Sequence, residues 1–339
     1  MKYYWIYIFS IFLSQEHVTG FETLPTPKKE VWPQLVVGGK EDLALGHIEK
    51  IQKEVIKKPY GDVLDAGTGI YSLSWLAGLL YRYHDPKSEL FMKSFVAVTA
   101  DPTFQKEVRA KADELGIGEK GQVLLGNWAA NYKYNDYRKG SSEGSCESPS
   151  ANIMDVAMEK GEYLCEDQMF DTILADYLVG AVDYFAPFFQ DLLFERLGNH
   201  LKPDGVLYLT GLNPIPEKGD SVASDLFCEV TKLRDACILL ARSRPYREHP
   251  PDFVVRHLEQ SNFKVLDVAT FPRKYNYGKM KLQLDEARST LPFITNEELR
   301  RSMANEIDRL DHACKTECEK LPNNEFEFGF DWIITARKI

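Results

Sequence analysis

The chain has 339 residues, of which 44% are hydrophobic and 27% charged, so a largely disordered protein is excluded. The net charge is −10, and no block of Lys and Arg is large enough to hold a phosphate backbone, so we expect no nucleic-acid partner. Six cysteines are too few for a disulfide scaffold. Cys314 and Cys318 lie one helical turn apart, but no second close pair completes a zinc site, so we expect no metal.

The chain begins with an apolar segment. Residues 1–20 contain one Lys followed by a run of about eleven apolar or aromatic residues, shorter than the roughly 20 needed to span a bilayer. This favours a signal or targeting segment, with residues 21–37 as a linker; a misassigned start or a buried amphipathic piece is the alternative. Phe21 and the following TLPTPKK resemble the plastid presequences of algae with complex plastids. We expect delivery to the secretory pathway or an organelle such as the plastid, otherwise the cytoplasm, and no stable membrane span.

Hydrophobic periodicity then predicts one α/β domain over residues 38–339. The predicted strands cover 62–65, 95–99, 122–125, 170–176, 206–210, 263–271 and 328–336, with a turn at 203–205. The predicted helices cover 40–58, 70–83, 102–115, 183–200, 220–241, 252–261 and 281–320. This alternation predicts a mainly parallel sheet covered by helices on both faces. We interpret 131–167 as an inserted mobile loop and 273–324 as an inserted helical segment, either a lid or a structural appendage.

A glycine-rich turn follows the first predicted strand. Asp65-Ala66-Gly67-Thr68-Gly69 lies between a strand and a helix, where an open α/β sheet binds its ligand. Glycines there let the backbone approach a ligand and leave helix N–H groups free to donate. The acid two residues before the first glycine suits a cationic or hydroxyl-rich ligand better than a pyrophosphate, and Ser72 stands where a dinucleotide fingerprint needs Gly or Ala. The turn therefore indicates a nucleotide-type cofactor, with a simple tight turn as the alternative.

At this turn the chain resembles the class I S-adenosylmethionine-dependent methyltransferases, and the resemblance covers roughly residues 40–339. Later segments follow in that family's order: VTADP at 98–102, GNW at 126–128, FDTILADYL at 170–178, LKPDGVLYL at 201–209 and FGFDWIITA at 328–336. The resemblance implies a doubly wound, mainly parallel, seven-stranded sheet whose last strand is antiparallel. Two features depart from the family pattern: Tyr71 replaces the third glycine of the turn, and a longer connection precedes the second strand.

The resemblance also implies S-adenosylmethionine as the cofactor and gives roles to individual residues. The residues implied to bind it are Asp65, Ala66, Gly67, Thr68, Gly69, Asp101, Asn127, Trp128 and Asp176. Asp65 would lie near the methionine amino end, Asn127 and Trp128 at the adenine, and Asp101 on the ribose. Thr99 is the alternative to Asp101, which we favour because a carboxylate accepts from both ribose hydroxyls.

The implied reaction is methyl transfer to a small-molecule acceptor, at oxygen or nitrogen, by in-line displacement at the sulfonium methyl. In such a reaction the protein mainly orients the two partners and excludes water. Where the acceptor must lose a proton, the candidate bases are Asp176, Tyr177, Tyr246 and His249. The aromatic stretch 179–189 forms either an acceptor pocket or ordinary core.

Two other functions remain open. One is a methyltransferase-like module that binds a cofactor or a partner without turnover, favoured by Tyr71 in the turn. The other is a short-chain-type dehydrogenase, for which Tyr275 and Lys279 supply Tyr-x-x-x-Lys with Ser261 upstream. That pair needs a helix, and the nearby Pro272 and Gly278 favour a loop instead. The sequence does not indicate an oligomeric state.

Overall fold

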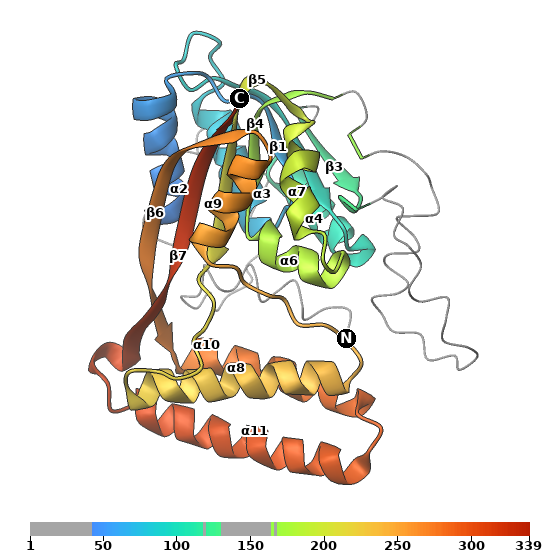
Figure 1. Ribbon diagram of the computed structural model, residues 1–339, viewed down its shortest axis with the longest axis vertical. Helices are drawn as coiled ribbons and strands as arrows, with labels where there is room; N and C mark the ends of the chain where they lie inside the picture. Colours follow the sequence, from blue (N-terminus) through green and yellow to red (C-terminus); the bar gives the residue numbers. More distant parts are fainter. Residues whose placement is uncertain (1–42, 118–119, 130–163, 166–167) are drawn as a thin grey trace, which may run out of the picture.

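The computed structural model describes residues 43–117, 120–129, 164–165 and 168–339, drawn as ribbon in Figure 1. The predicted targeting segment 1–20, the linker 21–37 and nearly all of the predicted loop 131–167 lie outside the described residues. None of the helices in the described part of the chain is long and apolar enough to cross a membrane.

Seven strands form one mixed sheet in the order β3-β2-β1-β4-β5-β7-β6 (Figure 1). The strands are β1 (Gly61–Asp65), β2 (Met92–Thr99), β3 (Gly121–Leu125), β4 (Phe170–Ala175), β5 (Leu201–Leu212), β6 (Phe263–Asn276) and β7 (Glu325–Lys338). The first five pair in parallel, whereas β7 runs antiparallel to both β5 and β6. The structure confirms the predicted doubly wound sheet with an antiparallel last strand.

Two apolar cores cover the two faces of the sheet. Alternate residues of one strand point to opposite faces, so Val63 of β1 packs into one core and Leu64 into the other. Helices α2 (Leu43–Ile51), α3 (Ile70–Arg82) and α4 (Pro102–Glu114) cover the first face. Helices α6 (Leu178–Phe185), α7 (Gln190–Gly198) and α9 (Pro251–Gln260) cover the second. A short π-helix, Gln52–Ile56, extends α2.

A helical bundle forms a third core beyond the end of the sheet. It consists of α8 (Val222–Leu240), α10 (Tyr277–Thr290) and α11 (Glu297–Cys318), which lie together below the sheet in Figure 1. The 14-residue strands β6 and β7 run on past their neighbours to reach it. Cys314 and Cys318 are buried in this core as ordinary packing residues. The bundle therefore combines the predicted insertion 273–324 with the predicted helix 220–241.

Several predicted boundaries of helices and turns are wrong, because a proline or a residue with left-handed backbone conformation lies there. The predicted helix 183–200 is wrong: the chain breaks between α6 and α7 around Pro187, since proline removes an N–H and clashes with the preceding turn. The predicted helix 281–320 is likewise two helices, separated by a short turn that contains Pro292. The predicted turn 203–205 instead lies inside β5, where Asp204 has a φ of 60°.

The predicted loop around Tyr275 and Lys279 is also wrong. Strand β6 continues to Asn276, and Pro272 is accommodated at a shift in its register against β7. Helix α10 begins at the next residue because the Asn276 side chain accepts a hydrogen bond from Lys279 N–H at 3.0 Å. Tyr275 therefore lies on a strand and Lys279 on a helix, so the two do not share the single helix face that a dehydrogenase pair needs.

Candidate active site

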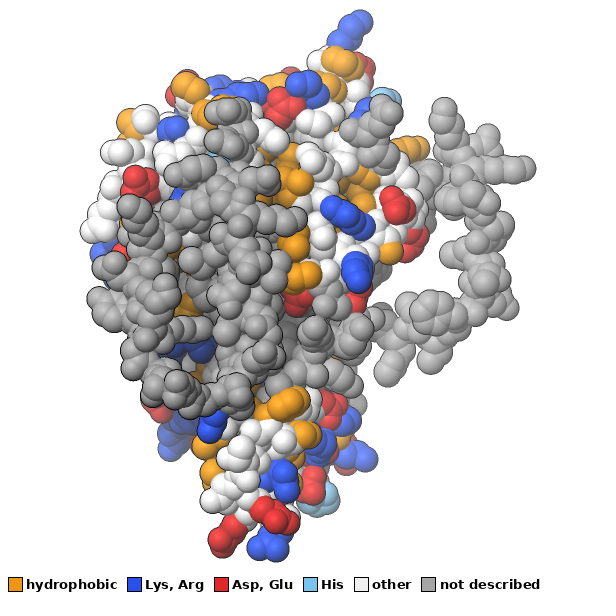
Figure 2. All heavy atoms as spheres, turned by 90° about the vertical axis from the view of Figure 1, so that its right-hand side faces the viewer, with side chains coloured by type: hydrophobic (Ala, Val, Ile, Leu, Met, Phe, Trp, Pro, Cys, Tyr) orange, Lys and Arg blue, Asp and Glu red, His pale blue; other side chains and the backbone are white. Residues whose placement is uncertain are grey.

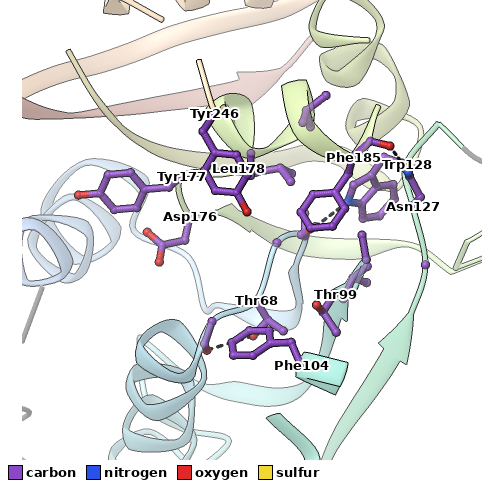
Figure 3. Close-up of a pocket in the computed structure, with 18 of the residues that line it drawn as sticks. Thr68, Thr99, Phe104, Asn127, Trp128, Asp176, Tyr177, Leu178, Phe185 and Tyr246 are labelled. Atoms are coloured by element: carbon purple, nitrogen blue, oxygen red, sulfur yellow. Dashed lines mark hydrogen bonds between the residues drawn. The ribbon is translucent and has the colours of Figure 1, made fainter. Parts of the chain in front are cut away.

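A cavity lies at the carboxyl ends of the parallel strands. The space between its lining residues amounts to about 840 Å³, which includes volume open to solvent. Its walls come from the segments that follow β1, β2, β3 and β4 and from α6 (Figure 3). In the sheet, β1 is flanked by β2 and β4, so the connections from β1 and β4 leave on opposite faces and open a crevice between them.

The glycine-rich turn forms the floor of this cavity. Ala66, Gly67, Thr68 and Gly69 all line it, and their binding of a cofactor stays a prediction. A Cβ at position 67 would lie 2.9 Å from Leu178 Cδ1, so glycine there leaves room for Leu178 of α6 to pack on the turn. At position 69 the nearest atom to such a Cβ is 4.0 Å away, so that side of the turn is open.

Asp65 lies beneath the turn, fully buried and not among the residues that line the cavity. Its Oδ2 accepts from Ser72 Oγ at 2.8 Å, and the same Ser72 Oγ accepts from Gly69 N–H at 3.0 Å. Burial raises the Asp65 pKa to about 6, although hydrogen bonds from Thr68, Ser72 and the Gly67 backbone oppose that rise. Asp65 therefore shapes the turn and fixes the first turn of α3.

The end of β2 presents Thr99 to the cavity. Asp101, the favoured ribose ligand, is half-buried and is not among the lining residues; its Oδ1 accepts from Phe104 N–H at 3.1 Å and so caps α4. Phe104 itself lines the cavity (Figure 3). The structure thus brings Thr99, the alternative ligand, to the cavity wall and gives Asp101 a capping role beside it.

Asn127 and Trp128 follow β3 and line the cavity. The polar groups of both side chains already make hydrogen bonds within the protein. The Trp128 indole N–H donates to Ala66 O at 2.6 Å, tying this loop to the glycine-rich turn. The Asn127 amide donates to Phe185 O at 2.8 Å and accepts from Ala129 N–H at 3.0 Å. Both side chains therefore present mainly their faces to a ligand, and Trp128 supplies a surface on which an adenine can stack.

Asp176 and Tyr177 follow β4 at the cavity wall. Thr210 Oγ1 on β5 donates to Asp176 Oδ1 at 2.6 Å and accepts from Tyr177 N–H at 3.0 Å. Tyr177 has a φ of 48°, the left-handed conformation that starts α6. Its hydroxyl donates to Asp331 Oδ1 at 2.8 Å, and Arg273 binds the same oxygen at 2.8 Å. Burial, reinforced by the charge of Asp331, raises the Tyr177 pKa well above its ordinary value, which argues against Tyr177 as a base at neutral pH.

The remaining two candidate bases lie in different surroundings. Tyr246 lines the cavity, and its hydroxyl points toward the centre, whereas the Tyr177 ring turns away (Figure 3). His249 is not among the lining residues: its ring stacks on Phe253 at 4.5 Å, and its carbonyl accepts from Trp332 Nε1 at 3.1 Å. Burial lowers the His249 pKa.

Sequence reasoning missed part of the cavity wall. Phe104 and Phe185 supply aromatic faces, and neither was singled out by itself. Phe185 belongs to the aromatic stretch 179–189, which the structure divides: Phe185 faces the cavity, while Phe189 is buried in the core of the sheet. Helical spacing was the available signal, because Ala181, Val182 and Phe185 recur three and four residues apart on one face of α6. None of the described lining residues comes from 273–324, so a lid role for that segment remains a prediction.

Charge is interspersed on the face shown in Figure 2, where Lys and Arg side chains lie among Asp and Glu over the described residues. Within the cavity wall that the structure describes, Asp176 supplies the carboxylate and no Lys or Arg is present. A cationic ligand therefore meets a compatible environment at this wall.

The placement of β7 decides the type of fold. The sheets of dinucleotide-binding dehydrogenases follow the strand order 3-2-1-4-5-6. Here an antiparallel β7 is inserted between β5 and β6. The fold is that of the class I methyltransferases. Tyr275 and Lys279, the residues of the dehydrogenase hypothesis, are not among the residues that line the cavity.

The chain is distantly similar to several solved structures. A coclaurine N-methyltransferase bound to N-methylheliamine and S-adenosylhomocysteine is 14% identical with a TM-score of 0.45, covering 88% of this chain and 75% of its own. A mycolic acid cyclopropane synthase complexed with S-adenosylhomocysteine is 16% identical with a TM-score of 0.43, covering 88% and 87%. The cyclase SpnF is 13% identical with a TM-score of 0.42, covering 86% and 80%. No protein-family model matches the chain, and no curated protein matches it by sequence.

Proposed function

We propose that the protein binds S-adenosylmethionine in the cavity and transfers its methyl group to a small-molecule acceptor. The observation that carries this proposal is the position of the cavity, which rests directly on the acid-x-G-x-G turn in a sheet of class I methyltransferase topology. Aromatic faces from Phe104, Trp128 and Phe185 suit a purine, and the Asp176 carboxylate suits the cationic part of the cofactor.

The residues of the cavity fit this cofactor in three respects. The open side of Gly69 leaves room for a ligand against the turn, where a larger side chain would intrude. Thr99 supplies a hydroxyl at the end of β2, where a ribose would lie. No Lys or Arg occurs on the described cavity wall to repel a sulfonium ion.

Bound S-adenosylmethionine supplies an activated methyl group together with its leaving group. The chain's own contribution is then to orient the two partners and exclude water. Thr210 holds the Asp176 carboxylate at the cavity wall through its 2.6 Å hydrogen bond. Tyr246 directs its hydroxyl to the centre of the cavity, where it is placed to hydrogen-bond an acceptor.

Calorimetric titration of the full chain with S-adenosylhomocysteine, and separately with NADH, tests the cofactor. We expect S-adenosylhomocysteine to bind with a dissociation constant in the micromolar range, about −8 kcal/mol, and NADH not to bind. A follow-up incubation with labelled S-adenosylmethionine and a panel of acceptors distinguishes an enzyme from a binding module. Binding of NADH alone would overturn the proposal, and cofactor binding without turnover on any acceptor would favour the module.

A further inference from the structure

The connection between α8 and α9 passes along α6 and reaches the cavity. Figure 1 shows it running from the helical bundle to α9, and Tyr246 in its middle directs its hydroxyl to the centre of the cavity (Figure 3). The residues of α6 that line the cavity are Leu178, Ala181, Val182 and Phe185. Those that contact the connection are Gly180, Asp183 and Tyr184. Within each set the residues recur three or four positions apart, so the two sets lie on different faces of the helix.

A buried carboxylate on α6 holds this connection in place. The Asp183 side chain is 5% exposed, and its Oδ2 lies 3.1 Å from Arg244 Nη2 and 3.8 Å from Arg247 Nε. The Arg247 backbone N–H also donates to Gly180 O at 3.4 Å. Because Arg244 and Arg247 flank Tyr246 in the sequence, one carboxylate fixes the chain on both sides of this tyrosine.

Two aromatic contacts complete the attachment. The Arg244 guanidinium lies 5.1 Å from the centroid of the Phe188 ring, just after α6, so a cation–π attraction adds to the ion pair. The rings of Tyr246 and Tyr184 meet edge to face, with centroids 5.9 Å apart and an interplanar angle of 69°. Tyr246 therefore rests its ring on α6 while its hydroxyl reaches into the cavity (Figure 3).

We propose that Tyr246 packs against the cofactor on the glycine-rich turn, besides reaching the acceptor, and that Asp183 and Arg244 are positioning residues that act through Tyr246. A side chain that is already held in its binding position loses less conformational freedom when the ligand binds, so the ion pair strengthens binding without touching the ligand. Neither Asp183 nor Arg244 is among the residues that line the cavity. This inference rests on the proposed function, because it assigns further residues to the binding of the same cofactor.

A double-mutant cycle on the affinity for S-adenosylhomocysteine, measured by calorimetry with the full chain, tests whether Arg244 acts through Tyr246. We expect Tyr246→Ala to weaken binding roughly tenfold and Arg244→Gln roughly fivefold. The double variant should bind as weakly as Tyr246→Ala alone, because Arg244 then has nothing left to position. Arg256→Gln is the matched control, since it breaks an ion pair with Asp252 at 2.7 Å on α9, outside the cavity wall, and should leave the affinity unchanged. Additive effects of the two substitutions, or unchanged affinity in either single variant, would overturn the inference.

Hydrogen exchange measured by mass spectrometry tests the positioning without any ligand. In Arg244→Gln the backbone amides of residues 243–249 should exchange at least roughly tenfold faster than in the wild type, while the amides of α9 keep their rates. Unchanged exchange in residues 243–249 would overturn the positioning role of the ion pair. Failure of the wild type to bind S-adenosylhomocysteine would overturn the cofactor proposal, and the exchange rates would then decide the role of Asp183 and Arg244 by themselves.

Discussion

The Tyr177 hydroxyl donates to Asp331 Oδ1 across a distance of 2.8 Å, joining the residue that starts α6 to strand β7, 154 positions later in the chain. Arg273 on β6 binds the same oxygen and is 4% exposed. Three elements thus hold one wall of the cavity, and none of the three residues is close in sequence to another. Two hydrogen bonds therefore stabilise the left-handed conformation of Tyr177: one from its hydroxyl to Asp331 and one from its backbone N–H to Thr210 Oγ1.

Substitutions of different residues in this network should lower the free energy of unfolding by different amounts. Tyr177→Phe removes one hydrogen bond and leaves the ion pair intact, so the free energy of unfolding should fall by about 1 kcal/mol. Asp331→Ala removes the carboxylate that binds the buried Arg273 guanidinium and should cost about 3 kcal/mol. Urea unfolding of the two variants measures both values. An Asp331→Ala cost no larger than that of Tyr177→Phe would contradict this account of the network.

Gly69→Ala separates ligand binding from folding. The residue has φ −115° and ψ 172°, which alanine adopts without strain, and the protein atom nearest to the added Cβ, Tyr71 N, is 4.0 Å away. We therefore expect unchanged or slightly higher stability, but at least a roughly tenfold loss of affinity for S-adenosylhomocysteine, because the Cβ intrudes on the ligand. Gly46→Ala is the control, since a Cβ there also meets nothing within 4 Å and Gly46 is not among the residues that line the cavity. Equal affinity in all three proteins would place the ligand elsewhere.

Trp128→Phe tests the aromatic wall against a second tryptophan. The substitution removes the hydrogen bond to Ala66 O and part of a stacking face, so affinity for S-adenosylhomocysteine should fall roughly fivefold. Trp75→Phe also removes an indole hydrogen bond, to Glu49 Oε1 at 3.1 Å, at a buried site that is not part of the cavity wall. Calorimetry should show weaker binding for the first variant only. A similar loss in both variants would mean that the effect comes from stability.

Asp65 should give the stability of the protein a distinctive pH dependence. Its pKa is about 6 in the folded chain against 3.8 as the ordinary value, so the folded state binds more protons between these values. The contribution of Asp65 to the free energy of unfolding is therefore fully present below pH 3.8 and lost as the pH rises through 6. Between pH 7.5 and pH 5 the wild type should gain about 1 kcal/mol relative to Asp65→Asn. Urea unfolding at both values measures this difference, and a gap that does not change with pH would show that Asp65 stays ionised.

The sequence by itself determined the class of fold and the floor of the cavity. Alternating apolar strands and amphipathic helices specify a covered, mostly parallel sheet, and the ends of parallel strands meet at one edge. A motif directly after a strand, such as residues 66–69, therefore reaches that edge wherever the remaining chain goes. Asn127, Trp128, Asp176 and Tyr177 reach the cavity wall for the same reason.

Only the tertiary structure decided which groups approach the site from outside these strand ends. Asp65 and Asp101 look alike in sequence, yet packing buries the first beneath the turn and commits the second to capping α4. Tyr246 comes from the connection between α8 and α9, and Asp331 comes from a distant strand. Long-range packing of three separate cores, rather than any local pattern of residues, sets their positions.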